Sequence, residues 1–291
     1  MPYQIFTIIA PVLLIAVLGW LYARSRPIDL TALNRLNVEL LSPLLVFTAM
    51  AQREVHWGAD LPLLAAVTLV TLGSGLAAWL LARRLRLNVP AFVVPQMFTN
   101  TGNMGLPLWL FAFGPQHFSS AVVVFVYLSL LHFTLGVRLF KREAALLSVI
   151  NTPMVWALLA GLAVQGLSIP MPIWLFKPME MVGSMAIPLM LFALGVRMAQ
   201  FRVSRWRDGL LAGVLCPASG LALAWVCVAL WDFAPAQAGI LLLYGALPPA
   251  VINYLFAEQY RQDPELVAAI VVAGTLLSLI FVPLGLALGM G

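Results

Sequence analysis

Charged residues are scarce in this sequence. Asp, Glu, Lys and Arg make up 9% of the 291 residues, and apolar residues make up 63%, whereas soluble globular domains carry about 25% charged residues. This excludes an ordinary soluble domain, and the length leaves room for roughly ten membrane spans of about 20 residues with short connections. The net charge of +5 comes from the connections, so it indicates membrane topology and no nucleic-acid partner.

Residues that carry covalent or metal chemistry are also few. Cys216 and Cys227 are eleven residues apart in one apolar segment, too far for a disulfide within a helix, and this spacing fits no redox or metal motif. The three histidines are scattered, and no Ser-His, paired-Asp or metal-ligand spacing occurs, which argues against an intramembrane enzyme and predicts neither a metal nor a cofactor. No phosphate-binding loop or ATPase module is present, so we do not expect ATP-driven transport by this chain alone.

Ten apolar segments are expected to cross the membrane as helices. They cover approximately residues 3–22, 30–52, 61–82, 90–113, 117–140, 152–169, 174–198, 207–231, 235–258 and 264–289. Fourteen Lys and Arg residues lie in the connections after odd-numbered spans, against only Arg53 and Lys177 on the other side, so both termini should face outward. No basic residue precedes the first span and Arg24 and Arg26 follow it, so we expect a membrane helix there rather than a cleaved signal peptide.

The chain also contains an internal repeat. A shift of 145 residues aligns residues 43–47 with 188–192, residues 74–77 with 219–222, and the prolines at 90 and 235. The halves, residues 1–145 and 146–291, each hold five spans, an odd number, so the second half should lie upside down relative to the first. Inverted repeats are typical of secondary transporters that bind substrate near the membrane midplane, at the repeat interface.

Two apolar segments are interrupted. Residues 98–108 (FTNTGNMGLPL) and residues 244–253 (YGALPPAVIN) carry Asn, Gly and Pro in the middle of spans 4 and 9, and the 145-residue shift pairs residues 100–107 with 245–252. Open backbone at membrane depth is tolerated only where it faces protein or a water-filled cavity. We predict that both helices are broken and cross each other, although a kinked helix or a short loop is the simpler alternative for the first segment. The predicted crossing and hinge residues are Gly102, Gly105, Pro107, Pro248 and Pro249, together with Pro43 and Pro188, which should kink spans 2 and 7.

Broken helices expose backbone amides that attract anions without a cationic side chain. No Lys or Arg lies near either interruption, so an anion there would be held by amides and polar side chains. The candidate substrate ligands are Asn100, Thr101, Asn103, Asn253 and Tyr254, of which Asn100 is the strongest, while Asn103 and Asn253 could instead cap broken backbone. Ser184, with Ser42, Phe47 and Met185, could line the cavity beside the kinks, or could simply pack between helices.

Four ionisable residues are candidates for proton coupling: His132, Glu258, Glu180 and Glu39. His132 lies deep in span 5, where it could titrate near neutral pH or remain a neutral, hydrogen-bonded imidazole. Glu39 and Glu180 lie near span ends, where solvation explains them equally well, and Glu258 lies near the cytoplasmic mouth. Neither interruption contains an acid, so a sodium site there would depend on backbone carbonyls.

The segment from Asn100 to Leu108 (NTGNMGLPL) resembles the broken fourth helix of the auxin efflux carrier family, which includes plant PIN-type carriers and bacterial malonate-transporter-like proteins. Residues 247–260 (LPPAVINYLFAEQY) and 263–266 (DPEL) are similar to the family's ninth helix and the start of its tenth. The resemblance covers essentially the whole chain in span number and order. It implies ten helices in two inverted five-helix repeats of bile-acid-symporter/NhaA-like architecture, with a scaffold part, a moving transport part around the crossed helices, and often a homodimer.

The same resemblance assigns roles to individual residues. It implies that Asn100 binds substrate and that Pro107, Pro248 and Pro249 shape the crossing. Only about a dozen residues join spans 5 and 6, so the long central loop of the plant members is missing. This favours a bacterial-type carrier of the inner membrane, without loop-based phosphoregulation.

The leading interpretation is a secondary carrier of small organic anions, malonate- or auxin-like weak acids, that works by elevator-type alternating access with H⁺, Na⁺ or no coupling ion. The alternative is a channel or a ligand sensor on the same scaffold. A channel should have polar residues along several spans facing one pore, whereas polarity here is concentrated at the two interruptions.

The topology gives a direct prediction. A reporter that is active only in the cytoplasm, fused after Gly291, should stay inactive, because the charge bias places the C-terminus outside. The same reporter fused after Arg86, in the connection after span 3, should be active. Activity at Gly291 would contradict the proposed orientation.

Overall fold

The computed structural model describes residues 1–26, 28–52, 57–141, 152–201 and 203–290, and these residues form helices, loops and one isolated β-bridge. The α-helices are α1 (Pro2–Ser25), α2 (Leu30–Leu36), α3 (Ser42–Ala51), α4 (Trp57–Leu85), α5 (Val89–Met97), α6 (Leu106–Phe113), α7 (Pro115–Leu131), α8 (Val137–Phe140), α9 (Pro153–Gly166), α10 (Ile173–Ser184), α11 (Ala186–Gln200), α12 (Trp206–Leu230), α13 (Pro235–Ala246), α14 (Ile252–Gln259) and α15 (Pro264–Gly289). Three π-helical turns complete them: η1 (Asn37–Leu41), η2 (Thr101–Gly105) and η3 (His132–Gly136).

Prolines and polar caps set many of the helix starts. Helices α1, α5, α7, α9, α13 and α15 all have a proline in the first turn, where its missing N–H leaves no intrahelical bond unmade. Asn88 caps α5 by accepting a hydrogen bond from the amide of Ala91 at 3.1 Å, and Asp263 caps α15 in the same way through Leu266 at 3.3 Å. Gly114, with φ of 77°, makes the tight turn between α6 and α7.

Six helical stretches are long and apolar enough to cross a membrane. They are Pro2–Ser25, Asp60–Leu85, Pro115–Phe140, Ile173–Gln200, Trp206–Leu230 and Pro264–Gly289. The other four expected spans form shorter helices, which are α2–η1–α3, α5–η2–α6, α9, and α13–α14. The described chain is therefore all-helical with several apolar helices of membrane-spanning length, as expected of an integral membrane protein.

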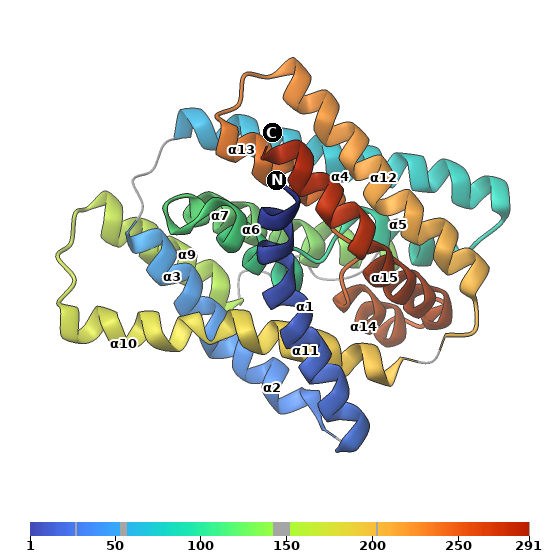
Figure 1. Ribbon diagram of the computed structural model, residues 1–291, viewed down its shortest axis with the longest axis horizontal. Helices are drawn as coiled ribbons and strands as arrows, with labels where there is room; N and C mark the ends of the chain where they lie inside the picture. Colours follow the sequence, from blue (N-terminus) through green and yellow to red (C-terminus); the bar gives the residue numbers. More distant parts are fainter. Residues whose placement is uncertain (27, 53–56, 142–151, 202, 291) are drawn as a thin grey trace.

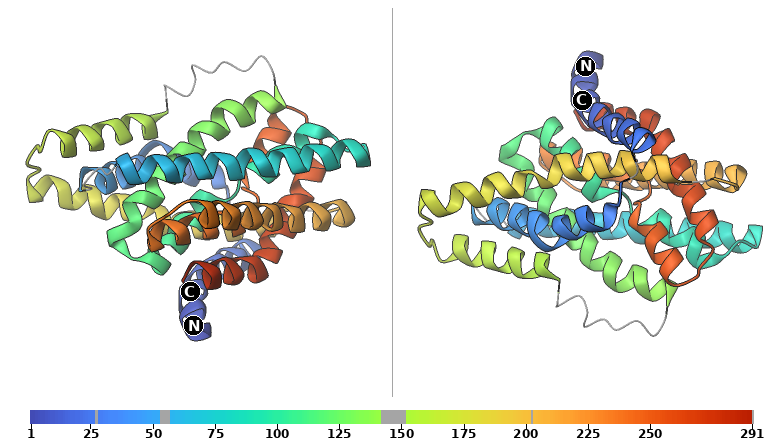
Figure 2. Two further views of the ribbon diagram at one scale, coloured as in Figure 1. Left: turned by 90° about the horizontal axis from the view of Figure 1, so that it is seen from above. Right: turned by 90° about the horizontal axis from the view of Figure 1, so that it is seen from below.

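The helices pack in two groups (Figures 1 and 2). In one group α1 lies along α11, and α3 packs against α9 and α10; in the other α12 packs against α15, α13 and α4, and α4 against α5. Each group takes helices from both halves of the chain, so the halves interlock, and the two termini lie near each other. The groups meet directly where α1 contacts α15, and through α6, which contacts both α1 and α13.

Glycine allows the close approach of α1 and α11. A Cβ atom at Gly195 would collide with the carbonyl oxygen of Ala16, and one at Gly19 would collide with the carbonyl oxygen of Phe192. The two backbones thus touch directly at reciprocal positions, as small residues allow between helices in membranes.

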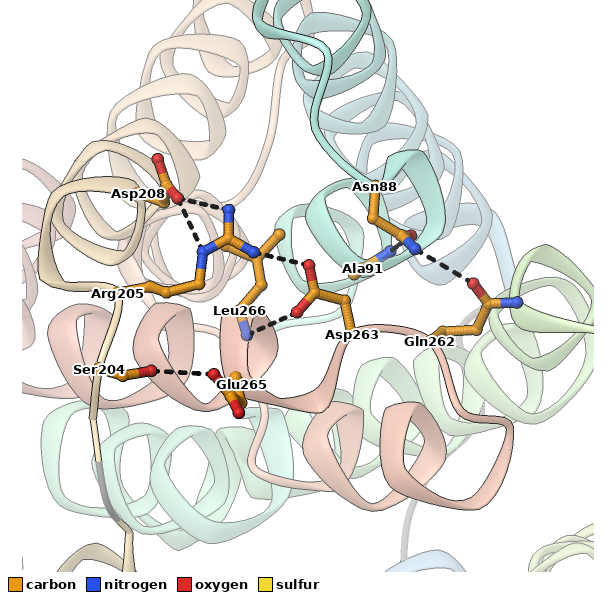
Figure 3. Close-up of polar contacts among 9 residues, drawn as sticks. All are labelled: Asn88, Ala91, Ser204, Arg205, Asp208, Gln262, Asp263, Glu265 and Leu266. Carbon is orange, nitrogen blue, oxygen red and sulfur yellow. Dashed lines mark hydrogen bonds and ion pairs between the residues drawn. The ribbon is translucent and has the colours of Figure 1, made fainter.

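One end of the second group is tied together by polar side chains (Figure 3). The Arg205 guanidinium bonds Asp208 at 2.6 Å and Asp263 at 2.7 Å, so the starts of α12 and α15 are joined. Burial lowers the pKa of Arg205, but hydrogen bonds and negative charge from these two carboxylates outweigh it and raise the pKa above its usual value. Beside them Asn88 donates to Gln262 at 3.4 Å (Figure 3). Gln262 in turn donates to the carbonyl of Phe140 at 3.2 Å.

Replacing Gly195 by Ala should destabilise the protein by about 1–3 kcal/mol, because the added methyl group must push α1 away from α11. The matched control is Gly166→Ala, since a Cβ atom at Gly166 meets nothing within 4 Å; it should be neutral or mildly stabilising. Thermal unfolding of the purified protein measures both. Equal effects of the two substitutions would contradict the close helix contact.

Candidate functional site

The fourth expected span is broken rather than kinked. Helix α5 ends at Met97, and the backbone leaves the helical conformation for residues 98–100, with φ −114° and ψ 96° at Phe98. The chain then re-enters a helix through the π-turn η2 at Thr101, and α6 follows with Pro107 in its first turn.

The ninth expected span is broken as well. Helix α13 ends at Ala246, and Leu247, which precedes two prolines, is extended with ψ of 145°; α14 begins at Ile252. The 145-residue shift places the equivalent of Met97, the end of α5, at Leu242, whereas α13 continues for four more residues to Ala246.

The two breaks bind each other through their backbones. The amide of Asn100 donates to the carbonyl of Pro248 at 2.7 Å, and the amide of Ala250 donates to the carbonyl of Phe98 at 3.0 Å, which makes the antiparallel bridge between Thr99 and Pro249. The side chain of Asn253 adds a third bond, from Nδ2 to the carbonyl of Phe98 at 2.9 Å. Peptide groups that leave their own helices thereby find partners across the crossing.

A cavity of about 160 Å³, the crossing cavity, opens beside this bridge. Its polar lining comes from the first break, Thr99 to Asn103, and from Asn37, Ser42, Ser129 and His132. The rest of the lining is mostly apolar, and consists of Val38, Phe98, Phe125, Leu128, Phe133, Met154, Met190, Ala250, Val251 and Ile252. Aromatic rings and thioethers therefore surround a single polar patch.

The predicted ligands divide into three that line the crossing cavity and three that do not. Asn100, Thr101 and Asn103 line it. Asn253 is fully buried behind the cavity, and its side chain bonds the broken backbone. This contact is the one expected if Asn253 caps broken backbone. Tyr254 points elsewhere, donating to Glu258 at 3.2 Å and packing on Phe201 with ring centroids 4.9 Å apart.

Ser184 belongs to a second, larger cavity of about 650 Å³, which also takes in Glu180, Asp60, His117 and Gln237. The larger cavity and the crossing cavity share three helical stretches. α3 contributes Leu45 to the larger cavity and Ser42 to the crossing cavity, and α7 and α11 are divided in the same way. The two cavities thus approach each other along the same helices.

The remaining predicted residues shape the surroundings. Gly102 lines the crossing cavity, whereas Gly105, Pro107, Pro248 and Pro249 do not and instead set the backbone. Pro43 follows the π-turn η1, and Pro188 follows the junction between α10 and α11, so the helix irregularities lie within a turn before each proline. Phe47 and Met185 line neither cavity.

Of the four candidate proton carriers, only His132 lines the crossing cavity. Glu39 is exposed and paired with Arg35 at 3.0 Å, and Glu180 is paired with Lys177 at 2.6 Å. Glu258 is exposed and accepts from Tyr254.

Sequence reasoning missed much of the cavity wall. Asn37 carried a usable signal, because it is an amide two helical turns inside the expected span 30–52. The side chains of Phe125, Phe133, Met154 and Met190 carried none, because apolar residues that face a cavity and those that face lipid have the same composition.

Several buried polar atoms near the crossing lack a hydrogen-bond partner. Among the described residues they include Thr99 Oγ1, Asn100 Nδ2, His132 Nε2 and Asn253 Oδ1, together with both amide atoms of Gln96. An unsatisfied buried polar atom costs about 1–3 kcal/mol, and the observation calls for an explanation. Three of these atoms belong to residues that line the cavity, where a polar ligand would satisfy them.

Asn253→Ala should lower stability by about 1–3 kcal/mol, because it removes a buried hydrogen bond that joins the two breaks. Asn103→Ala is the control, because Asn103 is half-buried in the cavity wall; it should stay within about 0.5 kcal/mol of the original protein. Chemical or thermal denaturation distinguishes them, and a larger loss at Asn103 would be the contrary result.

Comparison with known proteins places this geometry in a family. A family model described as a membrane transport protein matches residues 4–151 and again residues 141–286. An uncharacterized transporter from Methanothermobacter thermautotrophicus is 25% identical over 268 residues, which cover 88% of either chain. The matches extend over nearly the whole sequence, and they confirm the resemblance noted at the two interrupted helices. The chain therefore belongs to the membrane transport protein family, that of the auxin efflux carriers, and is a multi-pass membrane protein.

Proposed function

We propose that this protein is a secondary carrier of small organic anions that binds a carboxylate in the crossing cavity and moves it by elevator-type alternating access. The observation that carries the proposal is the crossing itself: two broken helices meet at a cavity where Thr99 Oγ1, Asn100 Nδ2 and His132 Nε2 are buried and unpartnered. Binding a polar ligand there satisfies groups that are otherwise costly to bury.

The chemistry of the polar patch favours an anion. Thr101 to Asn103 form the first turn of a helix, where amides lack intrahelical partners and carry partial positive charge. The amide of Thr101 donates to the carbonyl of Thr99 at 2.8 Å, which leaves the amides of Gly102 and Asn103 for a ligand. Asn100 Nδ2 is an unpartnered donor in the same wall. A carboxylate accepts from both, so Asn100 is the principal ligand in this proposal, with Thr101 and Asn103 beside it.

The proposal includes ten spans in two inverted repeats with both termini outside. The four shorter helical runs would then cross the membrane with the six long ones. Two successive matches to one family model support a repeat. Ser219 also donates to Ser74 at 3.2 Å, and contact between repeat-matched residues is expected near a pseudo-twofold axis. A homodimer in a bacterial inner membrane completes the proposal.

A carrier fits better than a channel. A channel needs one continuous polar path. Here the larger cavity and the crossing cavity are separate, and α3, α7 and α11 each contribute residues to both. Alternating access needs this arrangement, with a barrier between two approaches to one site.

Thermal-shift measurements on the purified protein test the proposal. Acetate, benzoate, phenylacetate and malonate should be screened with and without sodium, and at least one should stabilise the protein, by about 2.7 kcal/mol at 100 times its Kd. Asn100→Ala should remove this shift while leaving the ligand-free protein folded, because its Nδ2 makes no internal bond. Ser184→Ala, in the larger cavity, is the control and should keep the shift. A shift that survives Asn100→Ala unchanged would place the site elsewhere.

A further inference from the structure

The crossing cavity offers no fixed positive charge to an anion. Its described lining contains no Lys, Arg, Asp or Glu. Desolvating a carboxylate without a compensating charge is expensive, even where amides donate to it. Within this lining, His132 is the side chain that can gain a positive charge.

The surroundings of His132 are suited to a charged ring. It opens the π-turn η3 and is only 7% exposed. Its ring stacks on Phe98, the residue at the first break, with centroids 4.2 Å apart and planes 3° from parallel, and Phe256 meets it edge-on at 5.3 Å. Its Nε2 is buried and has no hydrogen-bond partner. The stacked face of Phe98 favours a cation, because an aromatic ring is negative above its plane.

Asn253 connects the histidine to the crossing. Its Nδ2 is engaged by the carbonyl of Phe98, while its Oδ1 has no partner and can only accept. Asn253 is also the polar side chain next to the imidazole. A ring N–H would give this oxygen a donor. Only the imidazolium carries an N–H on both nitrogens, so only the charged ring can donate to Asn253 and to a bound ligand at the same time.

We infer that His132 is a proton-binding site coupled to the substrate: the neutral imidazole takes up one proton when a carboxylate occupies the crossing cavity and releases it when the carboxylate leaves. One N–H bond forms on the ring, the proton comes from the aqueous side, and no bond of the substrate changes. For a monocarboxylate the pair that moves is then electroneutral, a carboxylate with a proton; a dicarboxylate such as malonate keeps one negative charge. This inference rests on the proposed function and specifies its coupling ion.

No other charge in the described surroundings can take this role. The cavity-lining elements and those packed against η3 carry few ionisable groups, and none of these groups lines the crossing cavity. Arg138 and Glu258 are exposed, Glu39 is paired with Arg35, Tyr127 is bonded to Thr68, and Tyr254 is bonded to Glu258. The others are Arg197, half-buried near the far end of α11, and His117, in the larger cavity.

Calorimetric titration of the full chain in buffers of different ionisation enthalpy tests the inference. Acetate, benzoate, phenylacetate and malonate, all ionised at pH 7.5, are the probes. Binding should be accompanied by uptake of about one proton, and affinity should fall about tenfold per pH unit above neutrality, because the bound state holds one more proton than the free state. In His132→Gln, which keeps hydrogen-bonding capacity without titrating, uptake should fall to near zero and affinity should become independent of pH.

His117→Gln is the matched control and should retain the full uptake, because His117 lies in the larger cavity. Uptake that persists in His132→Gln would put the proton on the substrate carboxyl and overturn the inference, while the carrier proposal stands. Binding that depends on Asn100 but takes up no proton in the unaltered protein would overturn it equally. Failure of all four probes to bind would remove the proposed site and the inference together.

A second measurement does not depend on the folding of the His132 variant. The chain has three histidines, so protein labelled with ¹⁵N-histidine gives few ring signals, and His117→Gln and His56→Gln assign the third by elimination. Adding a saturating probe should convert the His132 signal from a neutral ring to an imidazolium. A ring that stays neutral with the probe bound would overturn the inference.

Discussion

The backbone of a membrane protein must satisfy its own hydrogen bonds, and the whole arrangement depends on how two broken helices meet this requirement. Residues 98–100 and 247–251 leave their helices deep in apolar surroundings. Their peptide groups are satisfied across the crossing, through Asn100 to Pro248 and Ala250 to Phe98. Neither break would be tolerable without the other, so each half of the chain stabilises the broken helix of the other half.

Some polar atoms at the crossing have no hydrogen-bond partner, and these atoms form the proposed site. Bonds between the breaks use backbone amides and Asn253 Nδ2, but leave Asn100 Nδ2, His132 Nε2 and Asn253 Oδ1 without partners. Such atoms penalise an empty site and favour one that contains a complementary group. A carboxylate can satisfy donors. An imidazolium, with an N–H on each ring nitrogen, can donate to Asn253 Oδ1 and to the carboxylate together, so charge and hydrogen bonding lead to the same paired cargo.

The crossing cavity lies between two packed groups of helices. One group, tied at its end by Arg205 with Asp208 and Asp263, contains α5 and α13, which lead into the breaks. The other group, α1 with α11 and α3 with α9, supplies Met154 and Met190 to the cavity wall. The wall is thus shared between two packed bodies, a geometry in which relative displacement changes access to the cavity.

The sequence by itself determined the membrane class, the family and the place of both breaks, because apolar length, proline and glycine act locally on the backbone. It also identified Asn100, Thr101 and Asn103, polar residues with no reason to lie in lipid unless a cavity exists. Only the tertiary structure decided that Asn253 braces the crossing, that Tyr254 and Ser184 lie away from it, and that Phe125, Met154 and Met190 complete the wall. It also decided the register, since α13 extends four residues beyond the ungapped repeat. The reason is physical: a side chain's partners depend on the rotation and depth of helices far apart in sequence, which local pattern does not encode.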